Sequence, residues 1–340
     1  MTRARVIGAG VAGLCAAWEL ARAGVEIELV EAAATAGAGC SRYAGGMIAP
    51  WCELESAEPL IARLGAEALD FWTRDIPVAT IAGSLVVAPP RESAELTDFA
   101  RRTQHFSKLD ADGIAALEPD LAGRFDRALY FAQEAHLDPR QALDALDARL
   151  AGLPNVLRRF GVDADTLPAA PDWTIDCRGF AARGALLGLP GLRGVKGEML
   201  LLRSDEIRLS RPVRMLHPRR PAYIVPRGDG LFMIGATMIE NEERARVTAR
   251  SIVELVNSAF VIHPAFAEAE IVETGSDVRP AFIDNLPRLT LRGKTLYING
   301  LYRHGFLLAP ALATRAAQIV CDGANFPELM DAHSGERAFA

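Results

Sequence analysis

A group of glycines and one acid near the start of the chain have the types and spacing needed to bind a dinucleotide. The segment reads Gly8-Ala9-Gly10-Val11-Ala12-Gly13. The first glycine permits a tight turn, the second lets the backbone approach a pyrophosphate, and the third lets a helix pack closely on a strand. Free N–H groups at the helix N-terminus add partial positive charge. Glu31 follows 18 residues after Gly13, where its carboxylate can accept hydrogen bonds from a ribose diol.

The elements that would hold these residues form a strand–helix–strand unit. We expect a strand over Arg5–Ala9, a helix over Leu14–Arg22 and a second strand over Val25–Val30 that finishes on Glu31. The alternative is a glycine-rich turn that binds nothing. An acid at Glu31 disfavours the 2′-phosphate of NADP, but this unit alone leaves NAD and FAD open.

After Glu31 the sequence does not continue with the regularly alternating strands and helices that an NAD-dependent dehydrogenase would have. A glycine-rich loop, Cys40–Cys52, comes directly after the nucleotide unit, and Ala44, Gly45, Gly46 and Met47 lie in it. Two successive glycines allow the backbone to run close against a flat ligand. The further expected elements are a helix over 57–74, a strand over 84–88, a helix opened by Asp138 and Pro139, strands over 173–179, 198–203, 222–225 and 231–238 with a hairpin turn at 227–230, and a helix over 244–260.

A second strand–glycine–helix junction stands near the end of the chain. We expect a strand over Thr295–Gly300, a junction over Leu301–Pro310 and a helix over Ala311–Asp322. Such a junction suits a cofactor longer than a mononucleotide, because its helix N-terminus can stabilise negative charge on the N1–C2=O edge of a reduced flavin. This favours FAD, with cofactor contacts at Gly300, His304, Gly305, Phe306 and Leu307.

The predicted fold is therefore α/β, a Rossmann-like FAD-binding domain with an inserted substrate-binding domain built on an antiparallel or mixed sheet. We assign residues 1–80, 136–195 and 272–340 to the first domain, and 81–135 and 196–271 to the second.

Composition sets the outer limits on function. A formal charge of −6 without a long basic stretch argues against nucleic acid as a partner, and the loop Arg208–Arg220 is interpreted as solvated or in contact with another subunit rather than as a binding patch. Five cysteines without a CxxC pair indicate free thiols in a reducing compartment and no zinc site. Glycines and Glu19 interrupt the apolar N-terminus, so we expect neither a signal peptide nor a membrane span, and a cytoplasmic location.

Taken together, these residues resemble the D-amino-acid oxidase superfamily of flavoproteins, and within it the glycine oxidases of bacterial thiamine biosynthesis. The similarity covers essentially the whole chain. Besides Gly8–Gly13 with Glu31, the segments that carry the resemblance are Ala44–Pro50, Tyr223–Arg227, Ile234–Met238, Asp277–Pro280 and Arg303–Pro310.

The resemblance implies roles for four side chains. Arg279 would bind the substrate carboxylate, and a guanidinium offers two parallel charge-assisted hydrogen bonds for that purpose; an internal ion pair is the alternative. Tyr223 would donate its hydroxyl to the same carboxylate. Met238, 15 residues further on, would fill space and limit the substrate to a small side chain, or simply pack. Arg303 would lie near substrate and flavin, with a surface or interdomain ion pair as its alternative.

The resemblance also implies an activity: oxidation of glycine and other small amines, with non-covalent FAD, O₂ as acceptor, and glyoxylate, ammonia and H₂O₂ as products. It implies a homo-oligomer and transfer of the imine to the thiazole-forming enzyme. The alternatives are a sarcosine or D-amino-acid oxidase, a dehydrogenase with another electron acceptor, and a non-catalytic FAD-binding protein. No metal is expected.

Overall fold

The computed structural model describes residues 2–168, 172–184, 191–244 and 246–330. Contacts divide the chain into two compact units. The first contains residues 1–44, 140–195 and 278–340, and the second contains 45–139 and 196–277. Residues 45–80, assigned above to the FAD-binding domain, lie in the second unit by this measure. The assignment of a ligand to each unit remains a prediction.

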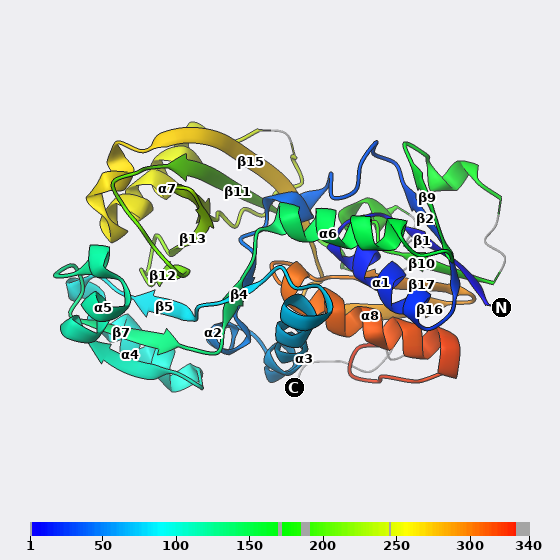
Figure 1. Cartoon of the computed structure of the whole chain (residues 1–340), viewed down its shortest axis with the longest axis horizontal. Helices are drawn as coiled ribbons and strands as arrows, with labels where there is room; N and C mark the ends of the chain where they lie inside the picture. Colours follow the sequence, from blue (N-terminus) through cyan, green and yellow to red (C-terminus); the bar gives the residue numbers. More distant parts are fainter. Residues whose placement is uncertain (1, 169–171, 185–190, 245, 331–340) are drawn as a thin grey trace. The chain divides into compact units, whose positions relative to one another are not determined.

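The first unit is built on a six-stranded sheet. In sheet order its strands are β16 (Arg288–Arg292), β17 (Thr295–Asn299), β10 (Trp173–Asp176), β1 (Arg3–Ile7), β2 (Glu26–Glu31) and β9 (Val156–Phe160). Figure 1 shows β10 between β1, at the blue start of the chain, and the orange β17. From β17 to β9 the strands are parallel, and β16 is antiparallel to β17. The carboxyl ends of β1, β2, β10 and β17 therefore meet at one edge of the sheet.

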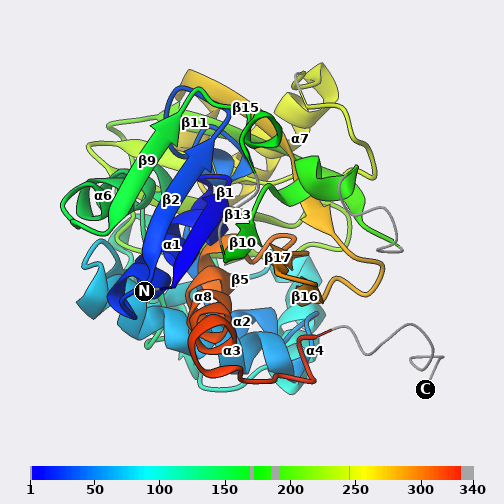
Figure 2. The same ribbon diagram turned by 90° about the vertical axis from the view of Figure 1, so that its right-hand side faces the viewer.

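Two helices pack together on this sheet: α1 (Val11–Arg22) and α8 (Gly305–Asp322). Figure 2 shows α8 below the blue strands β1 and β2, with α1 beside it. Leu14, Cys15, Ala16 and Leu20 of α1 are fully buried, because the helix is covered by the sheet and by α8. The other helical segments of this unit are α6 (Pro139–Ala151, whose first residue belongs to the second unit), η1 (Cys40–Tyr43), η5 (Ala164–Thr166) and η6 (Gly179–Arg183).

The second unit has an eight-stranded mixed sheet. Its order is β15 (Glu270–Ala281), β11 (Arg193–Arg203), β14 (Leu231–Gly235), β13 (Ala222–Gly228), β12 (Val213–Met215), β5 (Ser84–Val87), β7 (Arg127–Phe131) and β6 (Ser107–Asp110). Residues 278–281 of β15 and 193–195 of β11 belong to the first unit. A small sheet joins β3 (Met47–Ile48), β8 (Ala135–His136) and β4 (Thr80–Ile81). The helical segments are α2 (Pro50–Glu53), α3 (Pro59–Asp70), η2 (Phe71–Asp75), η3 (Pro90–Glu92), α4 (Ser93–Arg102), α5 (Ala111–Leu117), η4 (Pro119–Leu121), α7 (Ala249–Ile262) and η7 (Pro264–Ala267).

The core of the second unit lies where apolar side chains of the large sheet pack against α7. Leu200, Ile224 and Ile234, from three adjacent strands, are fully buried there with Leu255 and Ala259 of the helix. The predicted mixed sheet and its β13–β14 hairpin are confirmed. Positive φ angles at Gly228, Asp229 and Gly230 form the turn.

Two predicted helix starts are wrong by five or six residues, whereas α1 begins three residues before the predicted Leu14 and α3 two residues after the predicted 57. The helix expected from Arg244 begins at Ala249, where the Thr248 side chain accepts a hydrogen bond from the backbone N–H of Ser251; the expected span also includes residue 245, outside the described residues. The last helix begins at Gly305, six residues before the predicted Ala311. Pro310 therefore lies inside this helix, and the sequence interpretation had treated that proline as a boundary.

None of the helices in the described part of the chain is long and apolar enough to cross a membrane.

Candidate active site

The glycines at the carboxyl edge of the first sheet are fixed by close backbone packing. Gly8 has φ +97°, and a Cβ there would lie 2.8 Å from the Cys177 carbonyl oxygen. A Cβ on Gly13 would lie 1.7 Å from the carbonyl oxygen of Gly8. Only glycine lets α1 start this close to β1, so the turn has the geometry that the sequence predicted.

Glu31 ends β2 beside this turn. Its carboxylate accepts hydrogen bonds from the backbone N–H of Ala9 (2.7 Å) and of Ala33 (2.9 Å), which hold it in place. Each carboxylate oxygen has a second lone-pair direction, so the group can still accept from a ribose diol. The sequence analysis missed Ser41, whose hydroxyl accepts from the Val11 N–H at the first turn of α1 (3.1 Å). Ala44 ends the same short 3₁₀ turn.

The N-termini of α1 and α8 are neighbours. A Cβ built on Gly305 would lie 3.4 Å from a methyl group of Val11, so the first residues of the two helices are in contact range. Phe306 and Leu307 bury their side chains in the core, at 3% exposure each, and can offer a ligand only their backbone. The unit thus presents two positive helix ends side by side, as a diphosphate linked to a flavin requires.

A main-chain hydrogen bond joins the segment that carries Arg279 to the segment that carries Arg303 and His304. The N–H of Tyr302 donates to the Pro280 carbonyl (2.9 Å), so the residue after Arg279 lies against the turn that opens α8. Arg303 Nε is 3.2 Å from Nε2 of His304, the buried residue that precedes the helix. A Cβ on Gly300, where φ is +75°, would lie 2.3 Å from the Phe282 ring, so this turn also needs its glycine.

Tyr223 and Met238 lie at one end of the β13–β14 pair in the second unit. Tyr223 is directly opposite Gly235, and Met238 follows the end of β14 by three residues. Met238 is 54% exposed, so it is not part of the packed core of its unit. A Cβ on Gly45 would lie 2.6 Å from the Tyr223 ring, and one on Gly235 2.5 Å. These glycines therefore have a packing role, because each allows main chain to lie against the ring.

Gly46 and Met47 are held by the segment around β8. Gly46 has φ +72°, and a Cβ there would lie 2.1 Å from the Leu137 carbonyl oxygen. The Leu137 N–H donates back to the Gly46 carbonyl (2.9 Å), and Met47 pairs with His136. The glycine pair is thus required by protein contacts, and its predicted contact with the cofactor stays a prediction.

A buried acid that the sequence analysis did not single out supports the same loop. Glu134 is fully buried, and its Oε1 accepts from the backbone N–H groups of Trp51 (3.0 Å) and Cys52 (2.8 Å). Burial raises the pKa of this carboxyl to about 7, against the opposing effects of the Cys52 N–H and the Ser84 hydroxyl. No local sequence pattern marks Glu134, since its partners are more than 80 residues away.

Replacing Glu134 by Gln should change how stability depends on pH. The folded-state pKa is raised above the ordinary 4.5, so the folded chain binds the extra proton. The contribution of Glu134 to stability is therefore complete below about pH 4.5 and is lost as pH rises through about 7. Between pH 5 and pH 8, Glu134→Gln should gain up to about 3 kcal/mol relative to the wild type in urea unfolding.

The matched control for this measurement is Glu268→Gln, at an exposed position of the same unit. Its stability relative to the wild type should stay constant over that pH range. A difference between Glu134→Gln and the wild type that does not vary with pH would contradict the raised pKa.

The arginine-rich segment Arg208–Arg220, predicted as a loop, contains strand β12 and is only partly solvated. Arg211 donates to Glu118 (2.7 Å), which is 1% exposed, and to the Ala82 carbonyl (2.8 Å). Arg214 pairs with Glu53 and Glu55 at 3.4 Å. The interpretation as a solvated or subunit-contacting loop is therefore wrong for these two arginines, which form internal ion pairs. Arg208, Arg219 and Arg220 are exposed.

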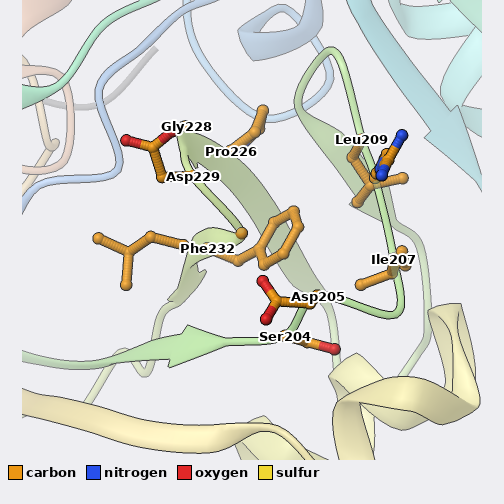
Figure 3. Close-up of a pocket in the computed structure, with 11 residues that line it drawn as sticks. Ser204, Asp205, Ile207, Leu209, Pro226, Gly228, Asp229 and Phe232 are labelled. Atoms are coloured by element: carbon orange, nitrogen blue, oxygen red, sulfur yellow. The ribbon is translucent and has the colours of Figure 1, made fainter.

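A pocket of about 500 Å³ lies at the turn of the β13–β14 hairpin (Figure 3). Its lining includes the apolar side chains of Phe232, Pro226 and Ile207 and the acids Asp205 and Asp229, with Asp205 between Phe232 and Ile207 in Figure 3. It contains none of the predicted site residues. Tyr223 lies three residues before Pro226 on β13 and does not line this pocket, so the pocket is not the predicted substrate site.

The first unit fits a flavin dinucleotide. Its glycine turn excludes side chains, Glu31 is oriented for a ribose, and two helix N-termini adjoin. The family model described as "FAD dependent oxidoreductase" (DAO) matches residues 3–319. The chain therefore belongs to the DAO family and is an FAD-dependent oxidoreductase, which confirms the predicted fold class and cofactor.

The chain is also similar to individual proteins of this family. The chain is 54% identical, over 96% of its length and 98% of the relative's, to a Rhizobium etli protein provisionally named a thiamine biosynthesis oxidoreductase (ThiO). It is 26% identical to glycine oxidase of Bacillus licheniformis, over 98% and 96% of the two chains. The crystal structure of glycine oxidase from Bacillus cereus has the same fold, with a TM-score of 0.80 and 22% identity over 96% of each chain.

Proposed function

We propose that this chain oxidises glycine, and with it other small amines such as sarcosine or D-alanine. The observation that carries the proposal is the position of Arg279, one residue from a carbonyl that is hydrogen-bonded to the turn opening α8. This main-chain contact supports a position of the Arg279 guanidinium near the N-terminus of α8. The resemblance of the chain to ThiO and to glycine oxidases supports the choice of substrate.

When bound, FAD would supply the hydride acceptor for the substrate α-carbon and the two-electron route to O₂ that gives H₂O₂, and water would convert the released imine to glyoxylate and ammonia.

In this proposal the residues of the chain orient the substrate rather than move its protons. Arg279 binds the carboxylate through two charge-assisted hydrogen bonds, and Tyr223 donates its hydroxyl to it. Arg303 adds positive charge near the reacting end, and Met238 limits the size of the substrate side chain. A clamped carboxylate fixes the α-carbon and so lowers the entropic part of the barrier. The first turn of α8, with Gly305, would hold the flavin ring of bound FAD with its positive helix end.

Anaerobic titration of the holoenzyme with glycine, sarcosine and D-alanine tests this function. We expect glycine to bleach the flavin absorbance band and peroxide to form when O₂ is admitted. Bleaching by sarcosine or D-alanine but not by glycine would favour the rival oxidases. Bleaching without peroxide would indicate a dehydrogenase, and no bleaching with any amine would favour a non-catalytic flavoprotein.

The cellular setting belongs to the same proposal. The resemblance to a protein named for thiamine biosynthesis supports a role in the thiazole branch, with the imine passed to the thiazole synthase. The five cysteines form no disulfide in the described part of the chain, which supports the proposal of a cytoplasmic location. Non-covalent FAD and a homo-oligomer complete the proposal.

A further inference from the structure

Arg227, on β13, is buried although the proposed chemistry gives it no part. Its side chain is 4% exposed. Nη1 donates to the carbonyl of Leu137 (2.9 Å), Nη2 donates to the carbonyl of Gly45 (2.8 Å), and the Asp138 carboxylate is 3.9 Å from Nε. The guanidinium therefore joins two main-chain segments that are far apart in sequence. A buried charge is costly unless its donors are satisfied, so this fork keeps both carbonyls at fixed positions.

The Gly45 carbonyl belongs to main chain that packs against the Tyr223 ring. A Cβ on Gly45 would lie 2.6 Å from the Tyr223 ring, so the main chain at Gly45 forms one wall against that ring. Gly235, directly across the strand pair, forms another wall, with a corresponding distance of 2.5 Å. Arg227 and Tyr223 lie four residues apart on β13, and Gly45 meets both of them.

The contacts that hold the residues next to Gly45 do not hold the Gly45 carbonyl, which is bound by Arg227. The neighbouring residues are fastened to β8 by the Leu137–Gly46 hydrogen bond and by the two-residue β3–β8 pairing. Those contacts fix Gly46 and Met47, whereas Arg227 holds the Gly45 carbonyl itself. The same guanidinium fixes the Leu137 carbonyl that closely approaches Gly46.

We propose that Arg227 is a positioning residue for the oxidation: it holds Gly45 against the Tyr223 ring and so fixes the direction of the phenol hydroxyl. The inference rests on the proposed function, in which Tyr223 contacts the substrate carboxylate. Arg227 itself contacts neither substrate nor flavin. Its effect reaches the reaction only through Gly45 and Tyr223.

The test uses a matched pair of variants, Arg227→Lys and Arg211→Lys, in the holoenzyme. Arg211 is also a largely buried arginine that donates to two carbonyls, of Ala82 and Leu117. Lysine keeps the charge at both positions but cannot bridge two carbonyls as a planar fork does. Arg227→Lys should accelerate hydrogen exchange in residues 45–52 and raise the KM for glycine about 10-fold, with FAD retained. Arg211→Lys should lower the Tm and change neither quantity.

A double-mutant cycle with Tyr223→Phe identifies the route of the effect. We expect Arg227→Lys to add little to the KM of the Tyr223→Phe variant. The positioning role would be overturned, and the proposed function left intact, by either of two results. One is that the KM changes of Arg227→Lys and Tyr223→Phe multiply in the double variant, and the other is that hydrogen exchange in residues 45–52 is unchanged in Arg227→Lys. If Tyr223→Phe alone leaves KM unchanged, the substrate contact of Tyr223 is wrong and the positioning role falls with it. Should Arg227→Lys fail to fold, Arg227→Met in the same cycle decides between these outcomes.

Discussion

Arg279→Leu should raise the KM for glycine about 100- to 1000-fold while FAD remains bound. Charge-assisted hydrogen bonds contribute about 1.5–3 kcal/mol each, and the substitution removes two of them from the substrate carboxylate. A loss of about 3–4 kcal/mol in binding corresponds to this change in KM. Because Arg279 is proposed to hold the substrate and not the cofactor, the ratio of flavin to protein absorbance should stay that of the wild type.

The control for Arg279→Leu is Arg292→Leu, which removes an exposed arginine from β16 in the same unit. Its KM should be unchanged. Equal KM values for Arg279→Leu and the wild type would remove Arg279 from the substrate site. An internal ion pair would then be its role, the alternative already raised by the sequence.

Gly13→Ala should yield a protein that is nearly colourless after purification, whereas the wild type is yellow. The added Cβ would lie 1.7 Å from the carbonyl oxygen of Gly8, so α1 must move away from β1. That movement displaces the helix N-terminus from the pyrophosphate position and opens the turn at Gly8. Flavin absorbance per mole of protein and the rise in Tm on adding FAD measure the loss.

Gly152→Ala is the matched control, because a Cβ there meets its nearest atom, the Arg149 carbonyl oxygen, at an ordinary 3.5 Å. This variant should bind FAD as the wild type does. Full flavin content in Gly13→Ala would contradict the close packing of α1 on β1. A colourless wild type that binds NAD tightly would overturn the assignment of the cofactor.

Some features of the candidate site could be predicted from the sequence and others could not. The turn at Gly8 and the acid at Glu31 are local features, and their geometry is as predicted. Ser41, Glu134 and Arg227 were missed as contributors because the atoms they bind lie 30 to 182 residues away along the chain. A serine, a glutamate or an arginine has no distinguishing local pattern when its partners are distant main-chain groups.

Helix boundaries show the same limit. Pro310 marks the end of the predicted junction because proline removes a backbone donor. The structure continues α8 through it, and Leu307, Leu308 and Leu312 are almost fully buried on the helix. Packing against α1 therefore outweighs the local cost of the proline. This earlier start brings the helix N-terminus beside Val11, which the sequence could not indicate.

By itself, then, the sequence determined the dinucleotide turn, the alternation of elements and the resemblance to a flavoprotein family, because glycine spacing and apolar periodicity act over a few residues. Only the tertiary structure decided that the ends of α1 and α8 adjoin, that Glu134 is a buried acid, and that Arg227 joins Gly45 to Leu137. Each of these depends on burial and on contacts between distant segments, which exist only after the chain has folded.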